Sequence, residues 1–230
     1  MKTLGISLLF IVAGSFASES RADGLILKLP PDGSWVRYDL TAVVAEQPRA
    51  GISGTLTLRS VGRETVQEKP CRWIEVETRT ALPNMKGKLS VVYKLLIPEE
   101  HLGKGKSPLE HIARGWTRLG PQVPRPLIDT GTSRQGMLPD FLPGRLTAVK
   151  TLKKKRIVRY QQGNLNCFGS MAETKLDSVQ LVYSTWPHKK VPFGVAASTV
   201  RAAGGKINIT FELILNGMGT GAKSALPDRR

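Results

Sequence analysis

The chain has 230 residues, with 34 Lys or Arg against 18 Asp or Glu, so its net charge is +16 at pH 7. A chain of this length buries about 70% of its unfolded surface, so it needs neither a metal nor a disulfide merely to fold. The charge favours anionic partners such as acidic polysaccharide or lipid headgroups, but it does not indicate the fold.

Residues 1–22 have the three parts of a secretory signal peptide. Lys2 supplies a positive charge, an apolar stretch follows, and small residues precede Ala22. The stretch is shorter than the roughly 20 apolar residues of a membrane-spanning helix, although a retained anchor is the alternative. We expect cleavage after Ala22, or earlier after Ala17, and export to the periplasm or the cell exterior. The mature chain, 23–230, is expected to lack a transmembrane segment.

Apolar and polar side chains alternate along most of the remaining chain. Alternation places the apolar side chains on one face of a strand. A sheet with one packed face and one solvent-exposed face is typical of antiparallel strands. Gly and Pro residues separate these segments, as at the Gly204-Gly205 turn. We expect strands within residues 36–44, 55–59, 74–79, 89–97 and 207–215, and shorter ones at 25–29, 157–161, 179–183 and 195–201.

One segment has helical spacing instead. Ser107 and Glu110 form a capping box with Pro108 at the first helical position. Apolar residues then recur every three or four positions until a Gly-Pro pair ends the pattern. We expect a helix over 107–119 whose apolar stripe packs on the sheet, with Trp116 as its central contact. The predicted fold class is therefore mainly β, a curved antiparallel sheet (an incomplete barrel) packed on one main α-helix.

Two further segments depart from the alternating pattern. Residues 120–145 contain five prolines, which predict an irregular connection or short edge strands. Residues 217–230 are rich in Gly and predict a flexible tail. Because neither a linker nor a repeat divides the chain, we expect a single β-rich domain over 23–230 that includes both segments.

The densest cluster of positive charge is a candidate binding site for phosphate or carboxylate groups. A solvated loop is the alternative. Aromatic residues are scarce nearby, so the cluster does not predict stacking on bases, and we expect no nucleic acid partner. The cluster consists of Lys150, Lys153, Lys154, Lys155, Arg156 and Arg159.

The chain contains two cysteines, Cys71 and Cys167. An even number of cysteines in an exported protein predicts a disulfide, which would close a loop of nearly 100 residues. Two buried free thiols are the alternative. We expect the disulfide.

No spacing of reactive residues indicates catalysis or a bound metal. The three histidines, His101, His111 and His188, lack a second His at metal-ligand spacing, and the chain has no Gly-x-Ser-x-Gly nucleophile elbow. We expect no cofactor and no enzymatic activity. A hydrolase without a recognisable motif is the least favoured alternative.

Towards the C-terminus the chain resembles a known class of envelope proteins. Tyr183-x-x-Trp186 precedes a Val-Pro-Phe-Gly-Val turn at 191–195, and the tail contains Gly-Thr-Gly-Ala-Lys-Ser-Ala-Leu-Pro at 219–227. With the order of predicted elements, these motifs resemble uncharacterised exported bacterial proteins and periplasmic lipoprotein carriers of the LolA/LolB type. The resemblance implies an incomplete antiparallel barrel whose hollow holds acyl chains, and it carries over no functional residues.

Together these observations give two hypotheses for the function. The first is an exported, soluble, non-enzymatic protein that binds a hydrophobic or amphipathic envelope molecule, such as a lipid or a lipoprotein acyl chain, in the concave face of the sheet. The alternative is a polyanion-binding or scaffolding module of the cell envelope, which would bind an anionic polymer through its basic surface.

Overall fold

Strands form most of the computed structural model, which describes residues 24–45, 47–81, 87–103, 106, 108–127, 150–176, 179–204 and 207–226. The described elements are β1 (Trp35–Val44), β2 (Gln47–Val66), β3 (Lys69–Ala81), β4 (Lys88–Pro98), η2 (Glu99–His101), η3 (Pro108–His111), β5 (Arg114–Leu119), β6 (Arg125–Pro126), β7 (Lys150–Tyr160), β8 (Gly163–Leu176), β9 (Val179–Pro187), β10 (Val195–Gly204) and β11 (Ile207–Gly219).

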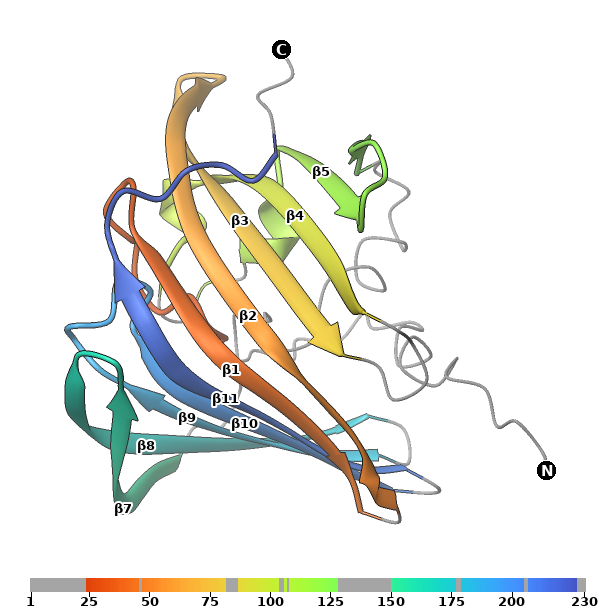
Figure 1. Ribbon diagram of the computed structural model, residues 1–230. Coiled ribbons are helices and arrows are strands. Elements are labelled where there is room, and N and C mark those ends of the chain that lie inside the picture. Colours follow the sequence, from red (N-terminus) through yellow and green to blue (C-terminus); the bar gives the residue numbers. More distant parts are fainter. Residues whose placement is uncertain are drawn as a thin grey trace.

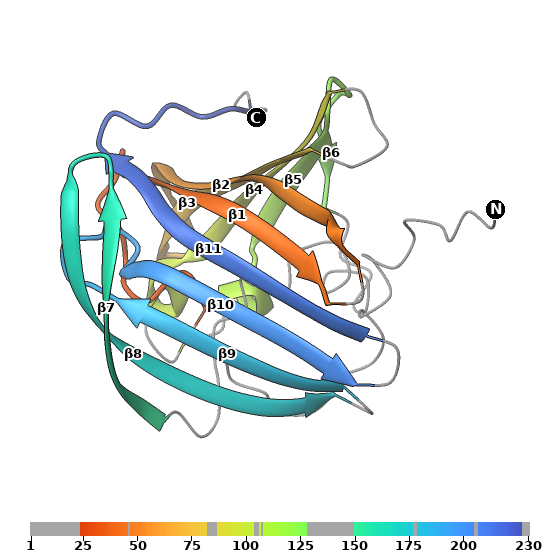
Figure 2. The same ribbon diagram turned by 60° about the horizontal axis from the view of Figure 1, so that its bottom comes forward.

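All the strands belong to one antiparallel 11-stranded sheet, in the order β6-β5-β4-β3-β2-β1-β11-β10-β9-β8-β7. Neighbours in the sheet are consecutive in the chain except where β1 pairs with β11. This pairing joins the first long strand to the last and connects two runs of hairpins. The sheet is strongly curved, so it has a concave inner face and a convex outer face (Figures 1 and 2).

The predicted alternation of side chains places the core on the inner face. In β1, Val36, Tyr38 and Leu40 are buried, and the residues between them are half-buried or exposed. Tyr38 lies in register between Leu215 of β11 and Leu56 of β2, which are also buried. The Tyr38 hydroxyl donates to the Val195 carbonyl oxygen at 2.9 Å, so the buried phenol is satisfied.

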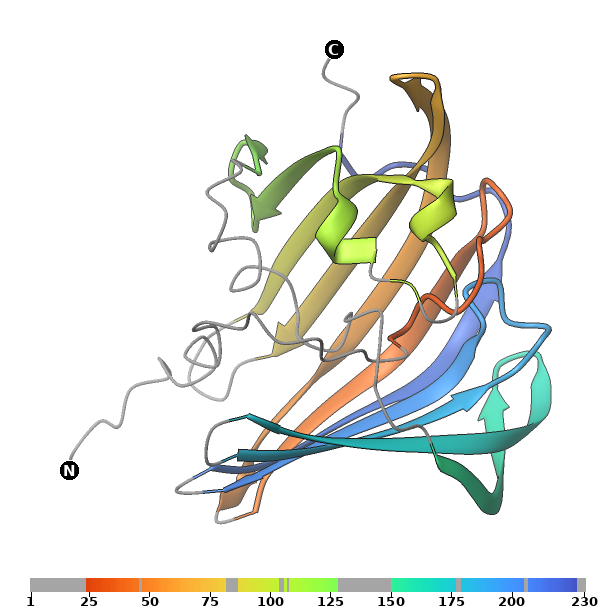
Figure 3. The ribbon, with the colours of Figure 1, turned by 180° about the vertical axis from the view of Figure 1, so that it is seen from behind.

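Segments of the chain outside the strands close one end of the inner face. Leu25 and Ile26 are buried beside Val191 and Phe193 in the same core cluster. The Leu27 N–H donates to the Phe193 carbonyl oxygen at 2.9 Å, which links these two segments. The 3-10 segments η2 and η3 lie on the same side of the sheet (Figure 3). This end of the concave face is therefore filled by the protein itself.

The predicted helix over 107–119 is wrong, and so is the predicted packing of the sheet on a main α-helix. The described part of the chain contains no α-helix, and the single 3-10 turn η3 is followed directly by strand β5. β5 pairs with β4, where Gly115 lies opposite Leu95. A helix over 107–119 would hold Gly115 in its interior, where glycine costs about 1 kcal/mol relative to alanine. Pairing of this segment with β4 therefore outweighs the local capping signal.

Trp116 therefore does not make the predicted contact with the inner core. It lies half-buried on the outer face of β5, opposite Lys94 of β4. Its ring centroid is 5.4 Å from that of Trp73, with the planes tilted by 46°. Of the capping-box residues, Ser107 and the side chain of Glu110 lie outside the described part of the chain.

The β7–β8 hairpin folds back over the outer face of β9, β10 and β11 (Figure 2). Arg156 of β7 donates to the Glu212 carboxylate of β11 at 2.9 Å, and its guanidinium lies 4.6 Å from the centre of the Trp186 ring of β9. Val158 and Leu165 lie on the side of the hairpin that faces the sheet and belong to the buried core cluster with Ala197, and the half-buried Trp186 and Ile214 pack against this cluster. The hairpin thus covers part of the outer face of β9, β10 and β11.

The C-terminal segment covers the outer face of the other half of the sheet (Figure 1). The prediction of a flexible tail from residue 217 does not describe it, because β11 continues to Gly219 and Leu226 is buried.

Residues 227–230 and residues 128–145 of the Pro-rich connection lie outside the described part of the chain. At the start of that connection, β6 is a two-residue strand at the edge of the sheet.

Candidate functional site

The end of the inner face where β1 leads into β2 carries a row of apolar side chains in register across five strands. Ala42 lies between Phe211 and Ile52, and Val200 lies between Phe211 and Tyr183. Ala42 is buried and the other four residues are half-buried. We call these five residues the inner apolar row.

A second apolar row lies beside it, one pleat nearer the end of the sheet. Ala202 pairs with Leu181 and with Ile209, and Ile209 pairs with Val44. All four side chains are half-buried. Both rows therefore keep part of their apolar surface accessible, whereas the opposite end of the inner face is filled by the chain itself. Among the described residues, no helix covers this surface (Figure 3).

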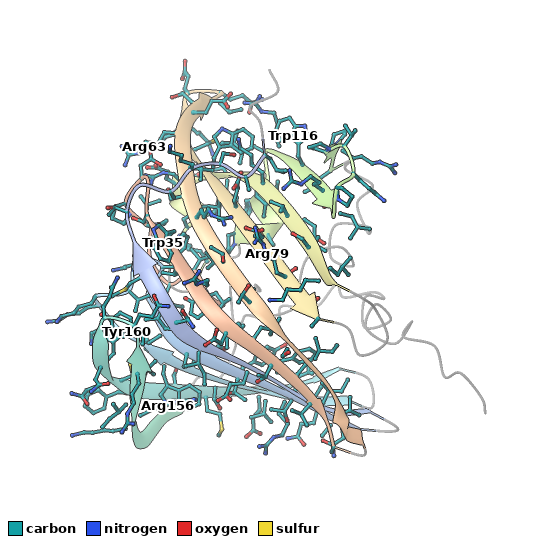
Figure 4. The ribbon with its side chains drawn as sticks, viewed as in Figure 1. Trp35, Arg63, Arg79, Trp116, Arg156 and Tyr160 are labelled. Atoms are coloured by element: carbon teal, nitrogen blue, oxygen red, sulfur yellow. The ribbon has the colours of Figure 1, made fainter. Side chains whose placement is uncertain are left out.

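The predicted basic cluster lies on β7, the edge strand of the sheet. The structure places its members on different faces. Lys155 and Arg159 are exposed, whereas Arg156 is half-buried against the sheet (Figure 4). Lys150 begins β7, and Lys153 and Lys154 follow in the same strand, but the side chains of these three lie outside the described part of the chain. Arg156 thus holds the hairpin against the sheet, and Lys155 and Arg159 face outward.

Two apolar side chains share the outward face of the hairpin with these cations. Ile157 is 60% exposed and Phe168 is 59% exposed. Lys155 lies opposite Phe168 in the ladder, and its Nζ is 5.3 Å from the centre of the Phe168 ring. Two exposed apolar side chains and two cations therefore share the outward face of the hairpin.

A group of buried charges lies on the outer face of β2, β3 and β4. Glu75, Glu77 and Lys94 are all at most 3% exposed. Burial by itself would raise the pKa of Glu77, but hydrogen bonds from Arg59 at 2.6 Å and Arg79 at 2.5 Å lower it below its usual value. Figure 4 shows Arg79 on this face of the sheet.

The C-terminal segment completes this buried group. Glu75 accepts hydrogen bonds from the backbone N–H of Ala225 at 2.8 Å and of Leu226 at 3.2 Å, and from the Ser224 hydroxyl. Lys94 Nζ donates to Ser224 Oγ at 3.1 Å. The resulting contacts hold the chain end on the sheet, so we assign these charges a structural role.

The two cysteines are not joined in the structure. Cys71 and Cys167 are both buried free thiols, so the predicted disulfide is absent and the alternative of two thiols applies. Each Sγ approaches the carbonyl oxygen two residues earlier, at 3.5 Å for Cys71 and 3.7 Å for Cys167. Burial raises the pKa of both thiols, which keeps them protonated at neutral pH.

Chemistry-bearing side chains do not converge elsewhere in the described residues. Among them, no three His, Cys, Asp or Glu side chains gather as a metal site. The His101 and His111 rings stack with their centroids 3.5 Å apart, and they belong to the two 3-10 segments. Within the described ranges we find no helix that is long and apolar enough to span a bilayer.

Three features of these surfaces were missed by sequence reasoning. Ile157 and Phe168 were assigned to no surface, although alternation within β7 and β8 could have placed them opposite the buried Val158 and Cys167. The alignment of the inner apolar row depends on strand order, which no local pattern encodes. The hydrogen bonds from the C-terminal segment to Glu75, which we call the Glu75 clamp, join residues about 150 positions apart. The sequence carries no signal for them.

Comparison with known proteins does not assign the chain to a family. No family model matches it, and no curated protein matches it significantly. Among solved structures, it is similar to a candidate exported protein with a YmcC-like fold from Bacteroides fragilis, with 9% identity and a TM-score of 0.37 over 85% of this chain and 99% of that one.

Two further solved structures show a similar level of likeness. A candidate lipoprotein from Parabacteroides distasonis has 7% identity and a TM-score of 0.35, over 88% of this chain and 100% of that one. A β-barrel-like domain of unknown function from Brucella abortus has 10% identity and a TM-score of 0.27, over 84% of this chain and 99% of that one. Similarity at this level assigns neither family nor function to the chain.

Proposed function

We propose that this chain is an exported, non-enzymatic protein of the cell envelope that binds an amphipathic molecule with an acyl chain on the concave face of its sheet. The observation that carries the proposal is the inner apolar row. Its residues come from five strands, face the same side and stay part exposed. Ligand sites of this kind are concave and mostly apolar.

The shape of the sheet supports the same proposal. Among the described residues, Leu25, Ile26 and Phe193 close one end of the inner face, and an acyl chain would enter from the end that carries the inner apolar row. The sheet curves between β2 and β9, so its inner face is concave (Figure 2). Burial of apolar ligand surface would supply the affinity.

Native mass spectrometry of gently purified protein tests the proposal, with titration of the fluorescent fatty acid cis-parinaric acid as a second measurement. We expect a co-purifying lipid and saturable binding of the probe. The double variant Val200→Asn and Phe211→Asn should weaken probe binding about tenfold or more, because each substitution removes an apolar contact worth about 1.5 kcal/mol or more.

The matched control uses the neighbouring positions on the same two strands. Thr199 and Thr210 face the outer side because successive side chains alternate. The double variant Thr199→Asn and Thr210→Asn should bind the probe as the unmodified protein does. Repeated absence of lipid together with no probe binding would contradict the proposal, as would equal weakening by both double variants.

A further inference from the structure

The outward face of the β7–β8 hairpin combines cations with exposed apolar side chains. Lys155, Ile157 and Arg159 lie opposite Phe168, Asn166 and Asn164, respectively, and all six are exposed. We call these six residues the hairpin face. It carries two positive charges and no carboxylate, and it lies on the opposite side of the hairpin from Arg156 and Val158, which contact the sheet.

The two apolar residues of the hairpin face lie close enough to form one patch. Ile157 is two positions along the strand from Lys155, whose cross-strand partner is Phe168. Such diagonal neighbours in an antiparallel ladder are about 7–8 Å apart, within reach of an aromatic side chain. Lys155 packs along the Phe168 ring, so its stem adds to the apolar surface and its ammonium borders it.

Protection of the sheet edge is a competing explanation for the cations. β7 is an edge strand, and lysines on an edge hinder pairing with another chain. That explanation fits Lys155 and Arg159, but not Ile157 and Phe168, because exposed apolar side chains next to an edge favour association. A partner that is anionic at its surface and apolar just beneath accounts for both kinds of residue.

We propose that the hairpin face docks on an anionic lipid surface. Ile157 and Phe168 enter the boundary between headgroups and acyl chains, while Lys155 and Arg159 contact the headgroup phosphates. The net charge of +16 of the full sequence adds a long-range attraction between the protein and an anionic surface. Docking uses different residues on the opposite face of the sheet from the inner apolar row, so it can succeed or fail independently of ligand binding there.

Co-sedimentation of the purified protein with phosphatidylcholine vesicles, with and without phosphatidylglycerol, tests the proposal. We expect binding only when phosphatidylglycerol is present, and weaker binding as NaCl is raised. The variant K155E/R159E should lower the partition coefficient about 30-fold or more, since each basic residue near an anionic surface contributes about fivefold.

A second variant separates lipid docking from general binding of polyanions. I157S/F168S should lose vesicle binding about tenfold or more but elute from a heparin column at the same salt concentration as the unmodified protein. The control K189E/K190E makes the same change in charge at two exposed lysines of the turn before β10. It should keep vesicle binding within a few-fold, and all variants should keep the unmodified unfolding midpoint.

Three results would overturn the proposal. Unchanged vesicle binding by K155E/R159E would remove the role of the hairpin face. An equal loss in K189E/K190E would show that only the overall charge matters. Full vesicle binding by I157S/F168S would show a contact with polyanions without entry of apolar side chains into the lipid.

Discussion

At Gly54 the backbones of β2 and β3 approach so closely that no side chain fits between them. A Cβ at this position would overlap the Arg79 carbonyl oxygen and lie 2.9 Å from Thr80 Cα. Both atoms belong to the backbone of the neighbouring strand, so rotation of a side chain cannot relieve the overlap. Glycine here is required by packing between strands, and not by a left-handed backbone conformation.

Gly54→Ala should therefore lower the free energy of unfolding by about 2 kcal/mol or more, because an added methyl group forces the ladder apart. Urea unfolding followed by tryptophan fluorescence measures the change. The matched control is Gly103→Ala, where a Cβ would meet no atom within 4 Å. That variant should be neutral or slightly stabilising. Equal destabilisation by both substitutions would contradict this account of Gly54.

Arg72 shows how the structure tolerates a charge in its interior. It is fully buried, and its guanidinium donates to Glu99 Oε1 at 2.7 Å and 3.0 Å, to the Pro30 carbonyl oxygen at 2.7 Å and to Ser60 Oγ at 3.0 Å. These bonds tie β2, β3, η2 and the N-terminal segment together. A buried charge is tolerated only when it is satisfied in this way.

Among the elements, β5 shows why a local signal can predict the wrong structure. The capping box and the apolar spacing over 107–119 are helical signals, but Trp116 and Thr117 are also good strand formers. Pairing with β4 satisfies the backbone groups of β5 and lets Trp116 pack on Trp73. The contacts that decide between helix and strand thus lie in a neighbouring strand, outside the segment itself.

The two 3-10 segments meet through their histidines. His101 of η2 stacks on His111 of η3, and Glu100 Oε1 lies 3.6 Å from His101 Nε2. Burial and the neighbouring His111 lower the pKa of His101 below its usual value of 6.5, against the opposing effect of Glu100. A proton on His101 would place a positive charge against the face of the stacked His111 ring, so the contact between η2 and η3 should weaken in acid.

Stability should therefore fall as the pH drops below 6.5. Because the folded pKa of His101 is depressed, the unfolded state binds the proton first, and the stabilisation present above pH 6.5 is lost as pH falls through the folded pKa. Urea unfolding at pH 7.5 and 5.5 should show a smaller loss for His101→Phe than for the unmodified protein. The pKa of His188 is also lowered, so the variant should remove only part of the loss. Identical losses would contradict the prediction.

On the scale of the whole molecule, one curved sheet is covered on its outer face by two separate segments. The β7–β8 hairpin packs over β9, β10 and β11, and residues 220–226 cross the other half. Glu75 and Lys94 would be exposed to solvent if only the inner face of the sheet were packed. The C-terminal segment buries them both. The fold therefore depends on a contact between β3 and the end of the chain.

Truncation after Gly219 should lower the free energy of unfolding by about 3 kcal/mol or more, because it removes the partners of buried charges and the buried Leu226. Glu75→Gln should destabilise the full-length chain strongly and the truncated chain less, since truncation has already removed the donors of Ser224, Ala225 and Leu226 and leaves the Arg59 guanidinium 3.9 Å away. A double-mutant cycle by urea unfolding measures this coupling. Additive effects of truncation and Glu75→Gln would show that the C-terminal segment does not depend on Glu75.

Alternation of apolar and polar residues was enough to predict which side chains of a strand share a face. Val36, Tyr38 and Leu40 are buried as their alternation predicts, because a period of two follows from the geometry of any strand. The same pattern locates the inner-face residues of β11, including Phe211. The basic cluster could also be located in the sequence. The sequence did not show that Arg156 contacts the sheet while Lys155 faces outward.

The features that join distant parts of the chain could not be predicted from local patterns, because they depend on how the strands pair. Strand order aligns Tyr183, Phe211 and Ile52 in one row, and strand pairing converts residues 114–119 from an expected helix into β5. The Glu75 clamp and the folded-back hairpin likewise depend on partners far away in the sequence. Local patterns fix the direction of each side chain, but its neighbours are selected by the packing of the whole chain.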